Sequence, residues 1–246
     1  MTSAISPQAE SPEPKPSEPK SSESRPAVNQ SDLAAEELTR RISSGEFMPG
    51  EKLNEVAIST QLNISRNTLR EAFATLVQQG LVKRIPHRGV FITKPTLTQL
   101  EEIYALRHII EPGALLWGSR EGLDNLDAIV RRAEDARDAA GPDLIDATAV
   151  SSAVSSANHE FHRAIVASAH SKHLDTVMSR VLAQMRLAFL HATQVDPSFH
   201  TRLIADNRKV ADLVSAGDFP GAADVLAHSL STTRQKLSSI FAEPQK

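Results

Sequence analysis

Three blocks of helical periodicity lie between residues 31 and 79, where apolar residues recur three or four positions apart. The first block starts at Ser31, whose side chain suits a helix cap. The second and third blocks cover residues 55–62 and 66–79. Two helices joined by so tight a turn are typical of a helix-turn-helix, which is therefore predicted over about residues 55–74.

The apolar period changes to two after Gly80. Apolar and basic residues alternate over residues 81–85, residues 86–89 (Pro-His-Arg-Gly) supply a turn, and a second apolar run follows over residues 90–94. This pattern predicts a β-hairpin directly after the helix-turn-helix. Residues 31–96 are accordingly predicted to form a winged helix-turn-helix domain.

Helical periodicity alone continues over residues 97–242. Blocks of helix length are separated there by Pro112, Pro142, Pro197 and Gly217. The blocks predict an antiparallel all-α bundle, and no fixed-period repeat indicates a solenoid. The expected fold class is therefore mostly α, with a small β-hairpin in the N-terminal domain and an all-helical second domain.

Residues 1–30 differ in composition from the rest of the chain. Six of the fourteen prolines lie within residues 1–26, and residues 11–26 contain no large apolar side chain. Such a segment cannot bury enough apolar surface to offset the entropy of ordering it. These residues are predicted to form a disordered Pro- and Ser-rich tail.

The composition indicates a cytoplasmic protein. The chain has no cysteine, which excludes disulfides and thiolate metal sites and is typical of a reducing compartment. No apolar run approaches the ~20 residues that a membrane-spanning helix needs. The first ten residues also lack the pattern of a secretory signal.

The formal net charge of −3 conceals a basic segment. Between Ser65 and Lys94, six Lys or Arg residues stand against one acid, Glu71. A basic surface on an acidic chain indicates a binding site for a polyanion. Arg66 and Arg70 are four positions apart, so they share one face of the predicted third helix. An arginine fork placed there can bond to O6 and N7 of guanine in a DNA major groove.

Further candidate contacts combine an amide and hydroxyl groups at the start of that helix with the tip of the hairpin. Asn67 can read adenine or a phosphate, and the hydroxyls suit phosphates near a helix N-terminus. The predicted DNA-binding residues are Ser65, Arg66, Asn67, Thr68, Arg70, His87, Arg88 and Gly89. The alternative is a protein-interaction module with solvated arginines. Lys83 and Arg84 are neighbours on the predicted strand, so their side chains point to opposite faces. At least one of the two therefore points away from any partner that they could share.

The segment PGEKLNEVAISTQLNISRNTLREAFATLVQQGLVKRIPHRGVFI resembles the winged helix of GntR-family transcription regulators. In that family the recognition helix begins with a Ser-Arg-x-x-x-Arg-Glu-Ala pattern, which here starts at Ser65. The resemblance covers about residues 31–94 and implies that operator DNA is contacted by Arg66, Thr68, Arg70, Arg88 and Gly89. FadR-type relatives can carry an arginine where Val56 stands, so this contact is absent here or is supplied by Lys52.

Residues 97 to about 241 resemble the FadR-like ligand-binding (FCD) domain of GntR regulators, in the segments TLTQLEEIYALRHIIEPGAL, NHEFHRAIVASA and NRKVADLVSAGDFPGAADVLAHSL. In that domain an Asp and three His commonly hold a divalent metal that helps to bind a small carboxylate. The corresponding residues here are Asn158, His162, Asn207 and Ser229. One imidazole with neutral oxygens suits a transition metal poorly, so no cofactor is expected. A helix rotation that turns Asp206 and His228 inward would restore a metal site with His162.

Without a metal, the same four polar side chains can line a pocket that holds an effector by hydrogen bonds. Arg107 is the fifth candidate, either as partner of an anionic effector or as a structural ion pair with Glu111, four residues later. Arg186, inside an apolar stretch, is a further candidate for an anion partner. The expected effector is a small molecule such as a carboxylate or a sugar derivative.

The resulting prediction is a DNA-binding transcription regulator, a repressor, whose operator binding is modulated by a metabolite in the helical domain. The regulator is expected to act as a homodimer, whose two recognition helices require a palindromic operator. An enzyme is not expected, because no nucleophile-base pair and no phosphate-cradling glycine loop is present. A nucleoid protein is the third alternative, and it would bind DNA without regard to sequence.

Overall fold

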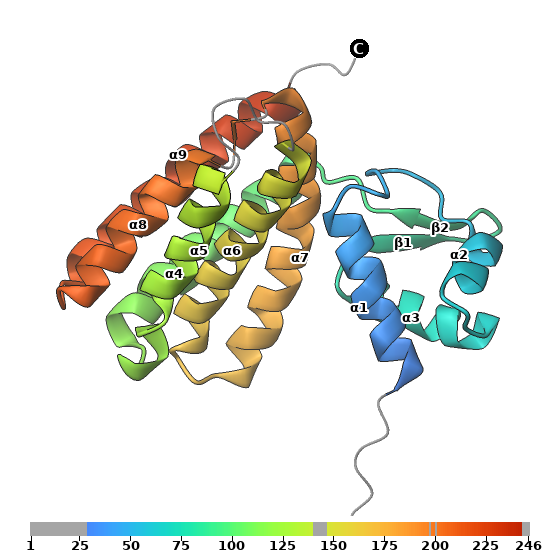
Figure 1. Cartoon of the computed structure of the whole chain (residues 1–246), viewed down its shortest axis with the longest axis horizontal. Coiled ribbons are helices and arrows are strands. Elements are labelled where there is room, and N and C mark those ends of the chain that lie inside the picture. Colours follow the sequence, from blue (N-terminus) through green and yellow to red (C-terminus); the bar gives the residue numbers. More distant parts are fainter. Residues whose placement is uncertain (1–28, 140–146, 197, 200, 243–246) are drawn as a thin grey trace, which may run out of the picture.

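The computed structural model describes residues 29–139, 147–196, 198–199 and 201–242, and most of the predicted tail lies outside this part of the chain. The N-terminal part consists of α1 (Gln30–Ser43), α2 (Glu55–Gln61), α3 (Arg66–Gln78), β1 (Val82–Ile85) and β2 (Gly89–Ile92). The C-terminal part consists of α4 (Leu97–Trp117), the 3-10 turn η1 (Glu121–Leu123), α5 (Leu126–Ala139), α6 (Ala147–Ala167), α7 (Lys172–Val195), α8 (Thr201–Ser215) and α9 (Phe219–Ala242). The two parts stand side by side (Figure 1).

Capping side chains fix where the first three helices begin. The cap of α1 is Asn29, whose side chain accepts a hydrogen bond from the Ser31 N–H, so the predicted cap at Ser31 is wrong by two residues. Asn54 caps α2 and Ser65 caps α3 in the same way. Each cap satisfies backbone N–H groups that the first turn of a helix leaves without a partner.

The predicted wing is present as an antiparallel pair in which Val82 lies opposite Ile92 and Ile85 opposite Gly89. Gly89 has a φ of +105°, a conformation that favours glycine, and the residue therefore allows the tight return of the chain. An isolated bridge between Lys52 and Phe91 joins the segment before α2 to this hairpin. The bridge places Lys52 beside the wing.

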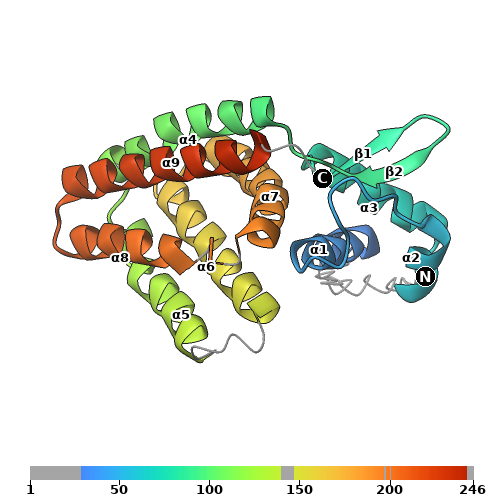
Figure 2. The same cartoon turned by 90° about the horizontal axis from the view of Figure 1, so that it is seen from above.

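The helical part is a bundle in which α4 and α9 run side by side and α8, α5 and α6 lie beneath them (Figure 2). Its core is formed by buried apolar side chains of all six helices. The described residues contain no helix with the length and apolar character that crossing a membrane would require. The predicted fold class, a winged helix-turn-helix with a small hairpin followed by an all-α domain, is confirmed.

Helix α7 connects the two parts. Ala183 and Leu187 on α7 are buried in the core of the winged helix, although they lie in the helical part of the sequence. Between them, Arg186 donates a hydrogen bond from Nη1 to Oγ of Ser43 at the end of α1 (2.8 Å). Arg186 was a candidate for an effector contact, and the structure places it instead at the contact between the two parts.

Candidate DNA interface and effector site

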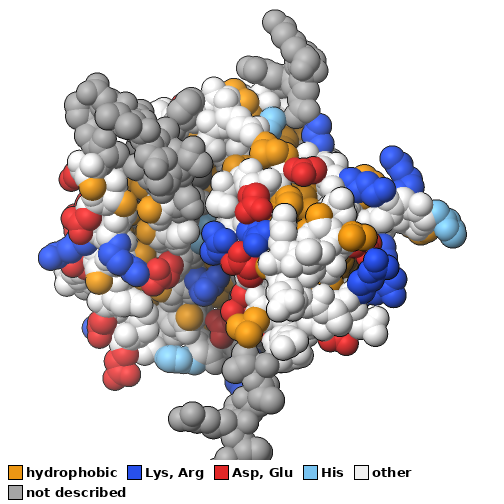
Figure 3. Space-filling view, turned by 45° about the vertical axis from the view of Figure 1, so that its right-hand side comes forward, with side chains coloured by type: hydrophobic (Ala, Val, Ile, Leu, Met, Phe, Trp, Pro, Cys, Tyr) orange, Lys and Arg blue, Asp and Glu red, His pale blue; other side chains and the backbone are white. Residues whose placement is uncertain are grey.

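A groove of about 710 Å³ separates the start of α3 from the wing. Five of its lining residues carry basic or imidazole groups: Lys52, Arg66, Arg70, His87 and Arg88. Glu55 is the one carboxylate in its lining. Lys and Arg side chains gather on the projecting part at the right of the molecule (Figure 3). A groove with this charge, flanked by a helix and a hairpin, fits a DNA backbone and its major groove.

The recognition arginines are held by the core on the other face of their helix. Leu69 and Phe73 are buried, whereas Arg66 and Arg70 are exposed. Neither arginine forms an ion pair with a described residue. Because both guanidinium groups keep their donors free, they can bond to phosphate or base acceptors without first breaking a contact within the protein.

The tip of the wing presents a second set of basic groups. The Arg88 guanidinium carbon lies 5.6 Å from the centre of the Phe91 ring, a cation-π contact that orients it. A Cβ at Gly89 would lie 3.2 Å from Cε of Lys52, so the lysine side chain packs closely against the backbone of the wing. The wing and Lys52 therefore form one side of the groove together.

Five of the eight predicted DNA-binding residues line the groove, namely Arg66, Arg70, His87, Arg88 and Gly89. The other three, Ser65, Asn67 and Thr68, lie on the first turn of α3 outside its lining. The Ser65 hydroxyl accepts from the Thr68 N–H (3.1 Å), so it already serves as the helix cap. Lys83 and Arg84 are exposed on β1 and do not line the groove.

Three buried ionisable groups form a cluster inside the helical part. Arg107 donates from Nε to Oε1 of Glu111 (2.5 Å), and Oε2 of the same carboxylate lies 2.6 Å from Nδ1 of His162. Arg107 is 2% exposed and its Nη2 also faces Glu111 (3.5 Å). Of the two interpretations of Arg107, this geometry is that of the structural ion pair.

The electrostatics of the cluster favour an ionised Glu111. Burial raises the pKa of Glu111, but the Arg107 and His162 groups outweigh burial and bring this pKa down to about 2. Burial lowers the pKa of His162, and the neighbouring Glu111 opposes that shift. The carboxylate is thus held as the charged acceptor between two donors.

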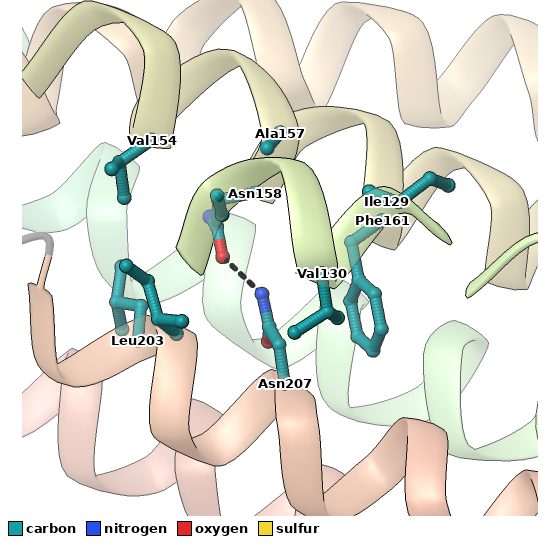
Figure 4. A pocket seen from close by; sticks show the side chains of 10 residues that line it. Ile129, Val130, Val154, Ala157, Asn158, Phe161, Leu203 and Asn207 are labelled. Carbon is teal, nitrogen blue, oxygen red and sulfur yellow. Dashed lines mark hydrogen bonds between the residues drawn. The ribbon is translucent and has the colours of Figure 1, made fainter. Parts of the chain in front are cut away.

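The two asparagines meet at a different place, between α5, α6 and α8. Nδ2 of Asn207 donates to Oδ1 of Asn158 (2.9 Å), and apolar side chains surround this pair (Figure 4). The cavity beside them measures about 10 Å³. This volume holds about one water molecule, so a larger ligand requires the helices to separate.

Ser229 is part of a third contact. Its hydroxyl donates to Oδ2 of Asp206 (3.0 Å). Ser229 is buried and His228 is exposed, so the helix rotation that would turn His228 inward is absent from the structure. The structure also buries His159 on α6, whose ring centre lies 5.9 Å from that of Phe189.

Family comparisons agree with this geometry. Residues 30–92 match the model of the bacterial regulatory proteins of the gntR family, and residues 102–232 match the model of the FCD domain. The chain belongs to the GntR family. It is therefore a DNA-binding transcription regulator with an FCD domain, and it is not an enzyme.

Individual relatives of this GntR regulator match parts of its length. The regulator YdhC of Bacillus subtilis is 28% identical over 59% of this chain and 63% of its own length. The Nta operon transcriptional regulator of Aminobacter aminovorans is 33% identical over 36% of this chain and 42% of its own length. The chain thus spans less than two thirds of these relatives.

Solved structures share the whole arrangement. A GntR transcriptional regulator of Rhodococcus sp. RHA1 is 26% identical, with a TM-score of 0.76 over 88% of this chain and 100% of its own. The McbR/YncC protein of E. coli is 18% identical with a TM-score of 0.71 over 86% of this chain and 98% of its own, and supports the fold alone.

The residues at the FCD metal positions do not fit a divalent metal. Nδ1 of His162 faces Glu111, both oxygens of Glu111 face donors, and the two asparagine side chains bond to each other. Within the described part of the chain, no three His, Asp or Glu side chains are grouped as metal ligands. Glu111 was named only as a partner of Arg107, and its contact with His162 was not predicted.

Proposed function

We propose that this regulator is a homodimeric repressor that binds a palindromic operator and responds to a small molecule in its helical domain. The observation that carries the proposal is the groove between α3 and the wing, with four Lys or Arg side chains in its lining. Two such grooves related by a two-fold axis fit two half-sites of one operator. Operator and effector then favour different arrangements of the dimer, so each weakens binding of the other.

Repression is supported by two relatives whose names state it. The transcriptional repressor NagR of Bacillus subtilis is 40% identical over 26% of this chain and 27% of its own length. The transcriptional repressor RspR of Escherichia coli is 36% identical over 30% of this chain and 32% of its own length. A repressor acts by occupying its operator, and effector binding would release it.

We expect helix α7 to transmit the effect of ligand binding from the helical domain to the winged helix. Asn158 and His162 lie on α6, which packs against α7, and α7 inserts Ala183 and Leu187 into the winged-helix core. A ligand that moves α6 would therefore reposition the winged helix. The expected ligand is a carboxylate or a sugar derivative, held without a metal.

The exposed face of α4 is the proposed dimer interface. Ile109 and Trp117 are 78% and 89% exposed, Leu116 is also exposed, and their spacing places them on one face. A Cβ at Gly113, between them, would meet nothing within 4 Å, which leaves room for close approach by a second copy. Because α4 directly follows the wing, pairing through α4 links two DNA-binding domains.

Selection from random duplex DNA tests operator binding and the dimer together. The wild-type chain is expected to enrich an inverted repeat and to sediment as a dimer. The Ile109→Glu/Trp117→Glu variant is expected to sediment as a monomer and to bind the same repeat at least tenfold more weakly, since one half-site contact is lost. The control Leu97→Ser alters another exposed residue of α4. Enrichment of no sequence would contradict the proposed regulator, and a dimeric double variant would contradict this interface.

Metal-independent binding is tested by elemental analysis of protein purified without chelator. We expect much less than one equivalent of zinc, nickel, manganese or iron per chain, because one imidazole and neutral oxygens bind such ions weakly. Treatment with EDTA is expected to leave the melting temperature and the DNA affinity unchanged. One bound metal per chain, lost together with stability on chelation, would show that the helical domain holds a metal site.

A further inference from the structure

Val56 is an exposed apolar side chain in a groove that is lined mostly by charged and polar groups. It is 56% exposed on the first turn of α2, and it lines the groove together with Arg66 and Arg70 of α3. Leu33 and Val77 are the other large apolar side chains that are exposed in the described N-terminal part, and both lie outside the lining. Single exposed valines are common on protein surfaces, so its place in the groove is what distinguishes Val56.

The backbone groups around Val56 are already engaged within the protein. The Val56 N–H donates to Oδ1 of Asn54 (3.1 Å), and the same oxygen accepts from the Ala57 N–H (3.1 Å). The carbonyl oxygen of Val56 accepts from the hydroxyls of Ser59 and Thr60, both at 3.0 Å. The Asn54 cap thus occupies donors with which a helix start would otherwise bind a phosphate. What Val56 offers to DNA is therefore its pair of methyl groups.

The surroundings of Val56 favour a base edge over the sugar-phosphate backbone as its partner. The neighbouring Glu55 carries the carboxylate of the groove, and this charge repels phosphates. A phosphate placed against valine methyl groups would also lose hydration without gaining a hydrogen bond. Arg66 and Arg70 line the same groove and carry guanidinium forks that match guanine in the DNA major groove. The position of Val56 is thus suited to the groove in which base edges are read.

Thymine is the base that offers an apolar partner in the major groove. Its C5-methyl group projects there, whereas the other bases are distinguished by hydrogen-bond donors and acceptors. A valine in a helix strongly prefers one χ1 rotamer, so the methyl groups of Val56 are held in place before DNA binds. Contact between these groups and the thymine methyl removes apolar surface of both partners from water.

We propose that Val56 is a specificity-determining residue, which selects a thymine in each operator half-site by contact with the C5-methyl group. This apolar contact adds to the hydrogen bonds that Arg66 and Arg70 offer to guanine in the same groove. It gives α2 a part in reading the operator beside that of α3. The inference rests on the proposed binding of a specific operator, and it names one base that the operator contains.

Exchange of single thymines for deoxyuridine in the selected operator tests this contact, because it removes the methyl group and keeps the base pair. Titration of labelled duplexes with the full chain at fixed salt measures the affinity. The wild type is expected to bind about fourfold more weakly per half-site when the contacted thymine is exchanged. Val56→Ala is expected to lose a comparable factor on the thymine operator and to be insensitive to the exchange, which closes a double-mutant cycle.

Val77→Ala is the matched control, because it shortens another exposed valine of the same domain. Val77 is 40% exposed on α3 and lies outside the groove, so this variant should keep both the affinity and the response to deoxyuridine. Val56→Thr retains one methyl group and is expected to respond to an intermediate degree. Because Val56 is exposed, neither substitution there should lower the melting temperature. Selection repeated with Val56→Ala should relax the preference for thymine and retain the guanines.

The outcomes separate this inference from the proposed function. If deoxyuridine weakens wild-type binding at no position, or weakens the wild type and Val56→Ala equally, the role of Val56 is overturned while the operator stands. A selected site with a single half would contradict the proposed dimer and leave the thymine contact intact. Enrichment of no sequence would overturn both the operator and the contact.

Discussion

Replacement of Glu111 by alanine is expected to destabilise the helical part by about 3 to 5 kcal/mol, because two buried donors lose their common acceptor. Arg107 is 2% exposed and cannot reach water without opening the bundle. His162 lies on another helix, so the substitution also removes a tie between α4 and α6. Urea unfolding followed by far-UV circular dichroism measures the loss.

Glu101→Ala is the matched control for this prediction. Glu101 lies on the same helix and pairs with Arg234, but both side chains are about 40% exposed, and such pairs contribute about 0 to 1 kcal/mol. The double variant Arg107→Met/Glu111→Leu removes both charges and is expected to recover much of the stability of Glu111→Ala. Equal losses for Glu111→Ala and Glu101→Ala would show that the buried cluster does not hold the bundle together.

Replacement of Arg70 by alanine is expected to weaken binding to the selected operator by about 1 to 3 kcal/mol, or roughly tenfold to a hundredfold. Arg70 is exposed in the groove and makes no ion pair with described residues, so its removal should leave the melting temperature unchanged. Titration of labelled operator and of a scrambled duplex at fixed salt separates loss of specificity from loss of charge.

Lys83→Ala provides the comparison, since it also removes one positive charge from the DNA-binding domain but lies outside the groove. It is expected to reduce affinity for both duplexes slightly and equally. Operator affinity that is the same in Arg70→Ala and in the parent would show that α3 does not read the DNA.

The winged helix is largely determined by local signals, and these could be found in the sequence. Apolar spacing located α2 and α3 within one residue of their ends, and the change of period after Gly80 located the hairpin. The cap of α1 was misplaced because Asn29 and Ser31 are both good capping residues, and only the backbone conformation distinguishes them. Charge along α3 and the wing indicated the surface that forms the groove.

The interior of the helical part depends on contacts that no local pattern encodes. Glu111 and His162 are 51 positions apart, and Asn158 and Asn207 are 49 apart. The position of each group follows from how six helices pack, so the sequence suggested one pocket where the structure has three separate polar contacts.

The sharing of α7 between two cores has a consequence for chimeric regulators. Ala183 and Leu187 complete the winged-helix core, while Met185 and Phe189 on the same helix belong to the bundle. A chimera that joins residues up to 96 of this chain to a foreign effector domain would lack α7. Its winged helix would therefore lose the two α7 side chains that complete its core. A working chimera therefore has to include the contact between α7 and the winged-helix core. Substitutions on one side of this contact are constrained by the residues on the other side.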